Sequence, residues 1–362
     1  MSSSTPLQRA VLILFLFFLV FAALFIAKPF LVPLTFGAIL SMLLYPMCKW
    51  MERLGVSRGF ASLLSVLSLL IIIASILALL GWQLSKMSQE MTGIEDKVKQ
   101  RINEVELSLQ SKFGVPKEKQ EQFLQKQQQS GGGNIPTTIS KALSYLSSFL
   151  VDTLVTFVYI FLLLYFRRQL RSFVLMIVSE ENKAVANKII FEASKVSQKY
   201  VSGLGMMIVM LWVMYGIGFS IVGVKNAVFF AILCGILEIV PFVGNLTGTA
   251  LTIIGSVTQG GGNMVAGILI TYAIVQFVQT YLLEPLVVGS AENINPLFTI
   301  IILLVGELVW GIPGMVLALP LLGIAKVVFD NIEPLKPYGY LIGKSKKKDD
   351  ENMMTKIKKW FS

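Results

Sequence analysis

Long apolar runs alternate with short polar turns along most of this chain. A helix needs about 20 predominantly apolar residues to cross a bilayer, and several of the runs approach that length. The pattern therefore predicts an all-α, polytopic membrane protein with about eight transmembrane helices. The expected spans are 10–27, 30–47 (closing at Pro46), 60–82, 148–166, 204–222, 264–282, 296–310 and 315–328.

A break interrupts the apolar region between residues 227 and 258, where Glu238, Pro241, Gly244 and Asn245 follow one another closely. Proline has no backbone N–H and blocks the carbonyl one turn back, so a helix kinks or stops there. Backbone groups freed in this way are tolerated in a bilayer only against protein or a water-filled cavity. We predict a broken or re-entrant segment that lines an internal site, with a loop at 260–263. The pattern leaves open whether 227–258 crosses fully.

The only large polar insert spans residues 83–147. Between Leu84 and Leu109 its apolar residues recur at steps of three and four, which predicts an amphipathic helix that continues the preceding span. This helix could fold back on its own chain or form a seam between subunits, and the second alternative predicts a homo-oligomer, with a pentamer as the working number. The stretch 183–200 has similar spacing, which fits a helix lying on the membrane interface or packed on cytoplasmic loops.

Charge changes the picture in two ways. Only 14% of the residues are charged, against about 25% in soluble proteins. The formal net charge is +10, and the positive excess gathers at 48–59, at 167–200 and after residue 329. Because basic loops favour the cytoplasmic side, we expect the N- and C-termini to be cytoplasmic. These loops border spans and lack a binding-domain signature, so we expect contact with lipid and not with nucleic acid.

The residue types present also restrict the chemistry. The chain has no histidine, which removes the commonest metal ligand and the usual catalytic base. The two cysteines, Cys48 and Cys234, cannot form a metal site alone. We therefore expect neither a metal, nor a cofactor, nor an enzymatic activity.

Together these patterns divide the chain into five segments. We expect N-terminal transmembrane helices at 1–82, a polar helical insert at 83–147, a fourth span with its cytoplasmic amphipathic helix at 148–203, a transport core at 204–328 and a basic cytoplasmic tail at 329–362.

Three glutamates lie in apolar surroundings: Glu238, Glu284 and Glu307. Three unpaired charges at depth would cost on the order of 8 kcal/mol on insertion scales. A folded protein has a total stability of only about 5–15 kcal/mol, so these carboxyl groups must be protonated, paired or in contact with water. A carboxylate that loads and unloads a proton or cation is a standard part of a coupled transporter. For Glu284 and Glu307, a position at the membrane edge is the alternative.

Amide side chains accompany these glutamates. Gln276 and Gln279 share one face of a span, and Asn245 and Asn295 flank breaks. Such amides either join helices or bind a polar solute, so we count them with the glutamates as candidate pathway residues. Helix breaks and hinges are predicted at Pro241, Gly244, Pro285, Pro296, Gly311, Pro313 and Gly314.

Four motifs carry a resemblance to a known family: 241–244 (PFVG), 284–285 (EP), 295–297 (NPL) and 311–315 (GIPGM). In order and spacing they are similar to those of the autoinducer-2 exporter (AI-2E) family. The resemblance implies a bacterial inner-membrane protein. It further implies either export of the quorum-sensing signal autoinducer-2, as assigned to some members, or sodium(lithium)/proton antiport, as assigned to others.

Three functions follow as hypotheses. The first is a secondary transporter that exports a small polar molecule such as autoinducer-2. The second is a cation/proton antiporter that uses the same glutamates. The third is a membrane scaffold whose external helix and basic tail bind partners, and it predicts that the glutamates are dispensable.

Overall fold

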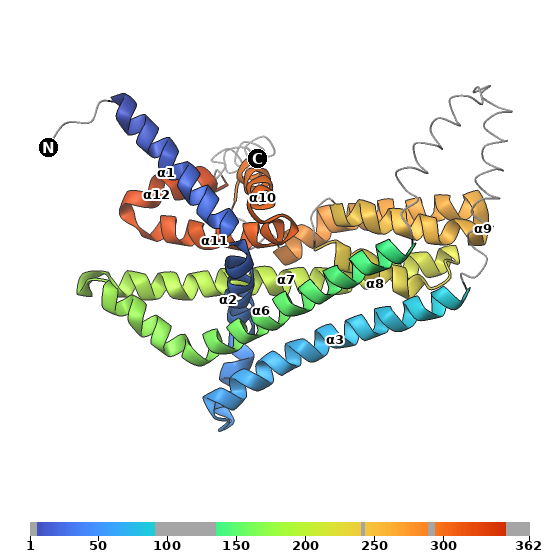
Figure 1. Cartoon of the computed structure of the whole chain (residues 1–362), viewed down its shortest axis with the longest axis horizontal. Helices are drawn as coiled ribbons and strands as arrows, with labels where there is room; N and C mark the ends of the chain where they lie inside the picture. The colour runs from blue at the N-terminus through green and yellow to red at the C-terminus, as the bar shows by residue number, and fades with distance from the viewer. Residues whose placement is uncertain (1–5, 91–134, 240–242, 289–293, 345–362) are drawn as a thin grey trace, which may run out of the picture. The chain divides into compact units, whose positions relative to one another are not determined.

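The computed structural model describes residues 6–90, 135–239, 243–288 and 294–344 (Figure 1). Within these ranges the chain is built from helices and forms no strand. The N-terminal elements are α1 (Pro6–Ile26), α2 (Lys28–Arg53), α3 (Arg58–Glu90), α6 (Ile135–Ile177), η1 (Glu180–Asn182) and α7 (Lys183–Val222). The C-terminal elements are α8 (Ala227–Leu237), α9 (Val243–Val278), η2 (Gln279–Val288), α10 (Pro296–Trp310), α11 (Ile312–Asn331), η3 (Glu333–Leu335) and α12 (Lys336–Ile342).

Six helical segments of the described chain are long and apolar enough to cross a membrane, and three shorter apolar helices accompany them. The six are Lys28–Arg53, Arg58–Trp82, Thr153–Ile177, Glu180–Val222, Asn263–Leu283 and Ile312–Asn331. The shorter ones are Val11–Ile26, Ala227–Leu237 and Pro296–Trp310. The predicted all-α, polytopic class is confirmed.

The helices pack as two compact units. The first unit comprises Met1–Leu63, Ile160–Met207 and Thr280–Ser362, and the second comprises Leu64–Tyr159 and Ile208–Gln279. Helices α3, α6 and α7 each supply residues to both units. The five-segment division expected from the sequence stays a prediction.

In the first unit, α10 and α11 form a close helical pair that contacts α2. Gly311 separates the two helices at φ +69°, a left-handed conformation that glycine adopts without steric cost. A Cβ on Gly314 would lie 1.9 Å from the Gly306 carbonyl oxygen, so the backbones meet only because both positions lack side chains. Trp310 Nε1 donates to the Leu24 carbonyl at 3.0 Å and ties α10 to α1. Helix α10 thus ends and α11 begins at Gly311, and a hinge role for residues 311–314 stays a prediction.

The predicted end of the second span at Pro46 is wrong, because α2 continues through Pro46 to Arg53. A proline inside a helix leaves the carbonyl four residues earlier without its usual donor, here that of Met42. Gln198 Nε2 from α7 donates to this Met42 carbonyl at 2.9 Å. Helix α7 therefore supplies the hydrogen bond that the Met42 carbonyl lacks. Prolines are tolerated in membrane helices when a neighbouring helix supplies such a bond.

One further boundary differs from the prediction: helix α7 is continuous where 183–200 and 204–222 were expected as separate helices. Residues 260–263 are helical, but the chain reverses direction within α9, because Gln279 beyond its far end returns to Glu238 beside its start. Glycine costs a helix only about 1 kcal/mol per residue. The single glycine at the expected boundary, Gly203, therefore does not end α7.

In the second unit, α8 packs against the first part of α9. Gly248 lies against Cys234, and Gly255 lies against the Phe230 ring, so glycines on α9 admit the α8 backbone and side chains. Helix α8 has 11 residues. At 1.5 Å per residue it is about 16 Å long, roughly half of the ~30 Å hydrocarbon core. It is therefore a half-length arm that cannot cross a bilayer alone.

Candidate functional site

The structure brings two of the predicted pathway residues together: Glu238 directly after α8 and Gln279 directly after α9. Gln279 Nε2 donates a hydrogen bond to Glu238 Oε1 at 2.7 Å. Both side chains are buried, with 8% of Glu238 and 1% of Gln279 exposed. A buried carboxyl group costs free energy unless it is hydrogen-bonded, and the amide supplies that bond.

Local backbone geometry fixes Glu238 at the tip of the α8–α9 hairpin. Its N–H still donates to the Cys234 carbonyl at 3.1 Å, so Glu238 closes the last turn of α8. Gly244 lies so close to this turn that a Cβ there would be 1.7 Å from the Leu237 carbonyl oxygen. Only glycine permits this approach, which supports the predicted break at Gly244. Pro241 lies outside the described residues.

Gln279 is placed by a change of helix type. The α-helical bonding of α9 ends at Val278, and the next ten residues, Gln279–Val288, form a π-helix. π-Helical turns are rare and frequently occur at functional sites. Pro285 falls inside this segment, where its missing N–H removes one bond of the ladder. Glu284 belongs to the same π-helical segment, but its side chain lies outside the described residues.

A row of buried hydroxyls on α9 lies in the same unit and was not anticipated from the sequence. Thr249, Thr252 and Ser256 are 5%, 0% and 0% exposed. Thr252 Oγ1 donates to the Gly248 carbonyl at 2.8 Å and lies 3.6 Å from Cys234 Sγ. The steps of three and four between these residues place them on one helix face, so the signal was present in the sequence.

Tyr215 on α7 is a further residue that sequence reasoning missed. It is 1% exposed and interacts electrostatically with Glu238, Cys234 and Tyr272. A lone tyrosine in an apolar span carries no spacing pattern, so only the packing of α7 against α8 and α9 reveals it.

The remaining predicted site residues lie apart from this pair in the chain. Gln276 is half-buried on α9, one turn before Gln279. Asn295 caps α10, because its side-chain oxygen accepts from the Leu297 N–H at 3.1 Å, directly before Pro296. Glu307 is exposed near the end of α10. The Asn245 side chain lies outside the described residues.

Pro313 lies in the first turn of α11, where a proline needs no hydrogen-bond partner for its nitrogen. Among the described residues, no three His, Cys, Asp or Glu side chains gather as metal ligands would.

Comparison with known proteins places this geometry in context. A family model described as "AI-2E family transporter" matches residues 11–333. "Putative transport protein YueF" of Bacillus subtilis is 27% identical over 343 residues, covering 88% of this chain and 91% of that protein. "Putative transport protein YrrI" of the same organism is 21% identical over 314 residues, covering 84% and 86%.

Proposed function

This chain belongs to the AI-2E family of transporters, and we propose that it exports a small polar solute by secondary transport, with the Glu238–Gln279 pair in its pathway. The family is one of transporters and not of enzymes, so the activity of the chain is membrane transport. Autoinducer-2, after which the family is named, is the candidate solute. We place the protein in the bacterial inner membrane, with both termini cytoplasmic.

The buried Glu238–Gln279 hydrogen bond is the observation that carries this proposal. A carboxyl group inside a membrane protein can bind and release a proton, and this couples solute movement to a gradient. Gln279 Oε1 is also buried and has no hydrogen-bond partner among the described residues. A buried acceptor without a donor costs about 1–3 kcal/mol, and a hydroxyl group of a polar solute would satisfy it.

The position of Glu238 also favours a second candidate, sodium(lithium)/proton antiport. Half-length membrane helices present their C-terminal carbonyls to Na⁺ or H⁺ in other secondary transporters. Helix α8 is such a half-length arm and ends directly before Glu238. Its last carbonyls, the carboxylate and Gln279 Oε1 are all oxygen groups, which suit a hard cation.

The polar insert at 83–147 enters the proposal as an oligomer contact. Residues 91–134 lie outside the described part of the chain, so a seam between subunits, the pentamer number and the scaffold hypothesis stay predictions. Deleting 84–130 would abolish function under the scaffold hypothesis, whereas transport through the α8–α9 hairpin predicts that the glutamates are essential.

Flux in proteoliposomes tests the proposal. Vesicles containing purified protein are loaded with labelled autoinducer-2, and a pH gradient is imposed across the membrane. We expect gradient-dependent efflux above that of protein-free vesicles. If efflux is absent while a sodium or lithium pulse drives proton movement, the antiport candidate replaces the exporter. If neither occurs with correctly folded protein, secondary transport of these solutes is contradicted.

A further inference from the structure

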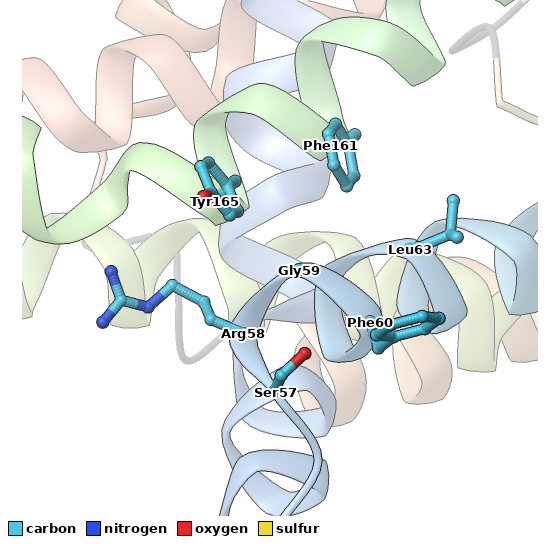
Figure 2. A pocket seen from close by; sticks show the side chains of 7 residues that line it. All are labelled: Ser57, Arg58, Gly59, Phe60, Leu63, Phe161 and Tyr165. Carbon is cyan, nitrogen blue, oxygen red and sulfur yellow. The ribbon is translucent and has the colours of Figure 1, made fainter.

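An open pocket of about 500 Å³ lies in the first unit at the corner between α2 and α3. It shares no residue with the Glu238–Gln279 pair. Figure 2 shows its lining, which comes from the residue before α3, the first two turns of α3 and α6, and which includes Ser57, Arg58, Phe60, Leu63, Phe161 and Tyr165.

The lining is polar at one end and apolar at the other. In the view of Figure 2, Arg58 and Tyr165 lie toward the left, Ser57 lies near the centre, and the apolar side chains of Phe60, Leu63 and Phe161 lie to the right of centre. Phe60 and Leu63 are 66% and 43% exposed, so the apolar end is open to its surroundings. A ligand that fits this lining has a polar head and an apolar body.

The pocket lies where lipid headgroups are expected. Arg58 is the first residue of the candidate span Arg58–Trp82, and Tyr165 lies just before Arg167 and Arg168, at the end of the span expected from the sequence at 148–166. Tyrosine and arginine at span ends are typical of the membrane–water interface. The apolar end of the pocket therefore extends along the hydrocarbon-facing part of α3.

Charge at the polar end favours an anion. Glu52 is the carboxylate of a cluster with three arginines: Arg167 Nη2 contacts Glu52 Oε1, and Arg58 Nε and Arg168 Nη2 each lie 4.0 Å from a Glu52 oxygen. One carboxylate cannot neutralise three guanidinium groups. Arg58 Nε, moreover, is buried with no hydrogen-bond partner among the described residues, so it retains a donor.

We propose that this pocket binds an anionic phospholipid. The phosphate is held by the Arg58 guanidinium, and an acyl chain lies on Phe60, Leu63 and Phe161. Arginine binds phosphate through charge-assisted hydrogen bonds, and basic pockets between membrane helices are known to hold lipid headgroups. The first N–H groups of α3 add a favourable field for the phosphate.

The test measures binding of fluorescently labelled phosphatidylglycerol to the full-length protein in a nonionic detergent. We expect Arg58→Gln to weaken binding about tenfold, the loss expected for one charge-assisted hydrogen bond. Arg53→Gln removes an equal charge from an exposed arginine outside the pocket and should leave binding unchanged. Phosphatidylcholine should bind more weakly than phosphatidylglycerol to the native protein.

A second variant and a competition experiment complete the test. Leu63→Trp fills the apolar end at an exposed position while every charge remains, and should also weaken phosphatidylglycerol binding if Arg58→Gln fails to fold. Excess inorganic phosphate and glycerol 3-phosphate should not displace the lipid. Equal losses in Arg58→Gln and Arg53→Gln, no effect of Leu63→Trp, or displacement by the free anions would each overturn the proposal.

Discussion

Gln279 Nε2 and Glu238 Oε1 lie 2.7 Å apart, although 41 residues of chain separate them. The bond joins the end of the half-length arm α8 to the end of α9, where α-helical bonding gives way to a π-helix. It closes the helical hairpin and holds a carboxyl group in an apolar interior. The same contact therefore serves stability and, under our proposal, transport.

Removing the amide should destabilise the hairpin. Gln279→Leu leaves the Glu238 carboxyl group without this donor, at a cost of about 1–3 kcal/mol for a buried group that loses a hydrogen bond. Chemical unfolding in detergent measures this cost, and an unchanged free energy of unfolding would contradict the role of Gln279.

A double-mutant cycle separates the pair from its surroundings. We expect Glu238→Leu and Gln279→Leu together to cost less than the sum of the single substitutions, with a coupling of about 0.5–3 kcal/mol for groups in direct contact. Strict additivity of the free energies of unfolding would show that the two side chains do not interact in solution.

Gly244→Ala should disrupt the tip of the hairpin. The new Cβ would lie 1.7 Å from the Leu237 carbonyl oxygen, so the backbone must shift, at a cost of about 1–3 kcal/mol. Gly205→Ala is the control, because a Cβ there meets nothing within 4 Å in α7. Thermal unfolding should show a loss for the first variant and no loss, or a small gain, for the second. An unchanged unfolding temperature for Gly244→Ala would contradict the close contact between Gly244 and the Leu237 carbonyl.

Gln198→Ala should destabilise the protein in a way that depends on Pro46. The substitution leaves the Met42 carbonyl without its donor from α7, which costs about 1–3 kcal/mol. In a Pro46→Ala background the N–H of residue 46 can donate to Met42, so the same substitution should cost much less. Unfolding free energies of the four proteins test this, and an equal cost in both backgrounds would refute it.

Much of the fold was predictable from the sequence. Apolar runs of membrane length indicate the spans, and prolines and glycines between them indicate where helices begin and end. Gly311 and Asn295 mark the ends of α10 as expected. The errors came from the assumption that every proline or glycine in an apolar run ends a helix. Pro46 stays within α2, and Gln198 donates to the Met42 carbonyl that the proline leaves without its usual donor. Gln198 comes from a distant part of the chain, so the local sequence could not predict this contact.

The sequence indicated which residues belong to the candidate site, but not which of them contact each other. Glu238 and Gln279 were singled out because polar side chains are rare in apolar spans, yet nothing in their spacing paired them. Asn295 was chosen on the same ground, and the structure gives it a capping bond to Leu297. Thr249, Thr252 and Ser256 were passed over because hydroxyls are weak polar signals, although their spacing places them on one face.

The most direct test of the account compares Glu238→Gln with Glu181→Gln in the proteoliposome assay. Glutamine at position 238 keeps the size and hydrogen-bonding capacity of the side chain but cannot carry a proton, so the fold should survive and gradient-driven flux should fall to that of protein-free vesicles. Glu181 is exposed in η1, and its substitution should leave flux unchanged. Undiminished, gradient-dependent flux through folded Glu238→Gln would contradict the proposal that this buried carboxyl group couples transport.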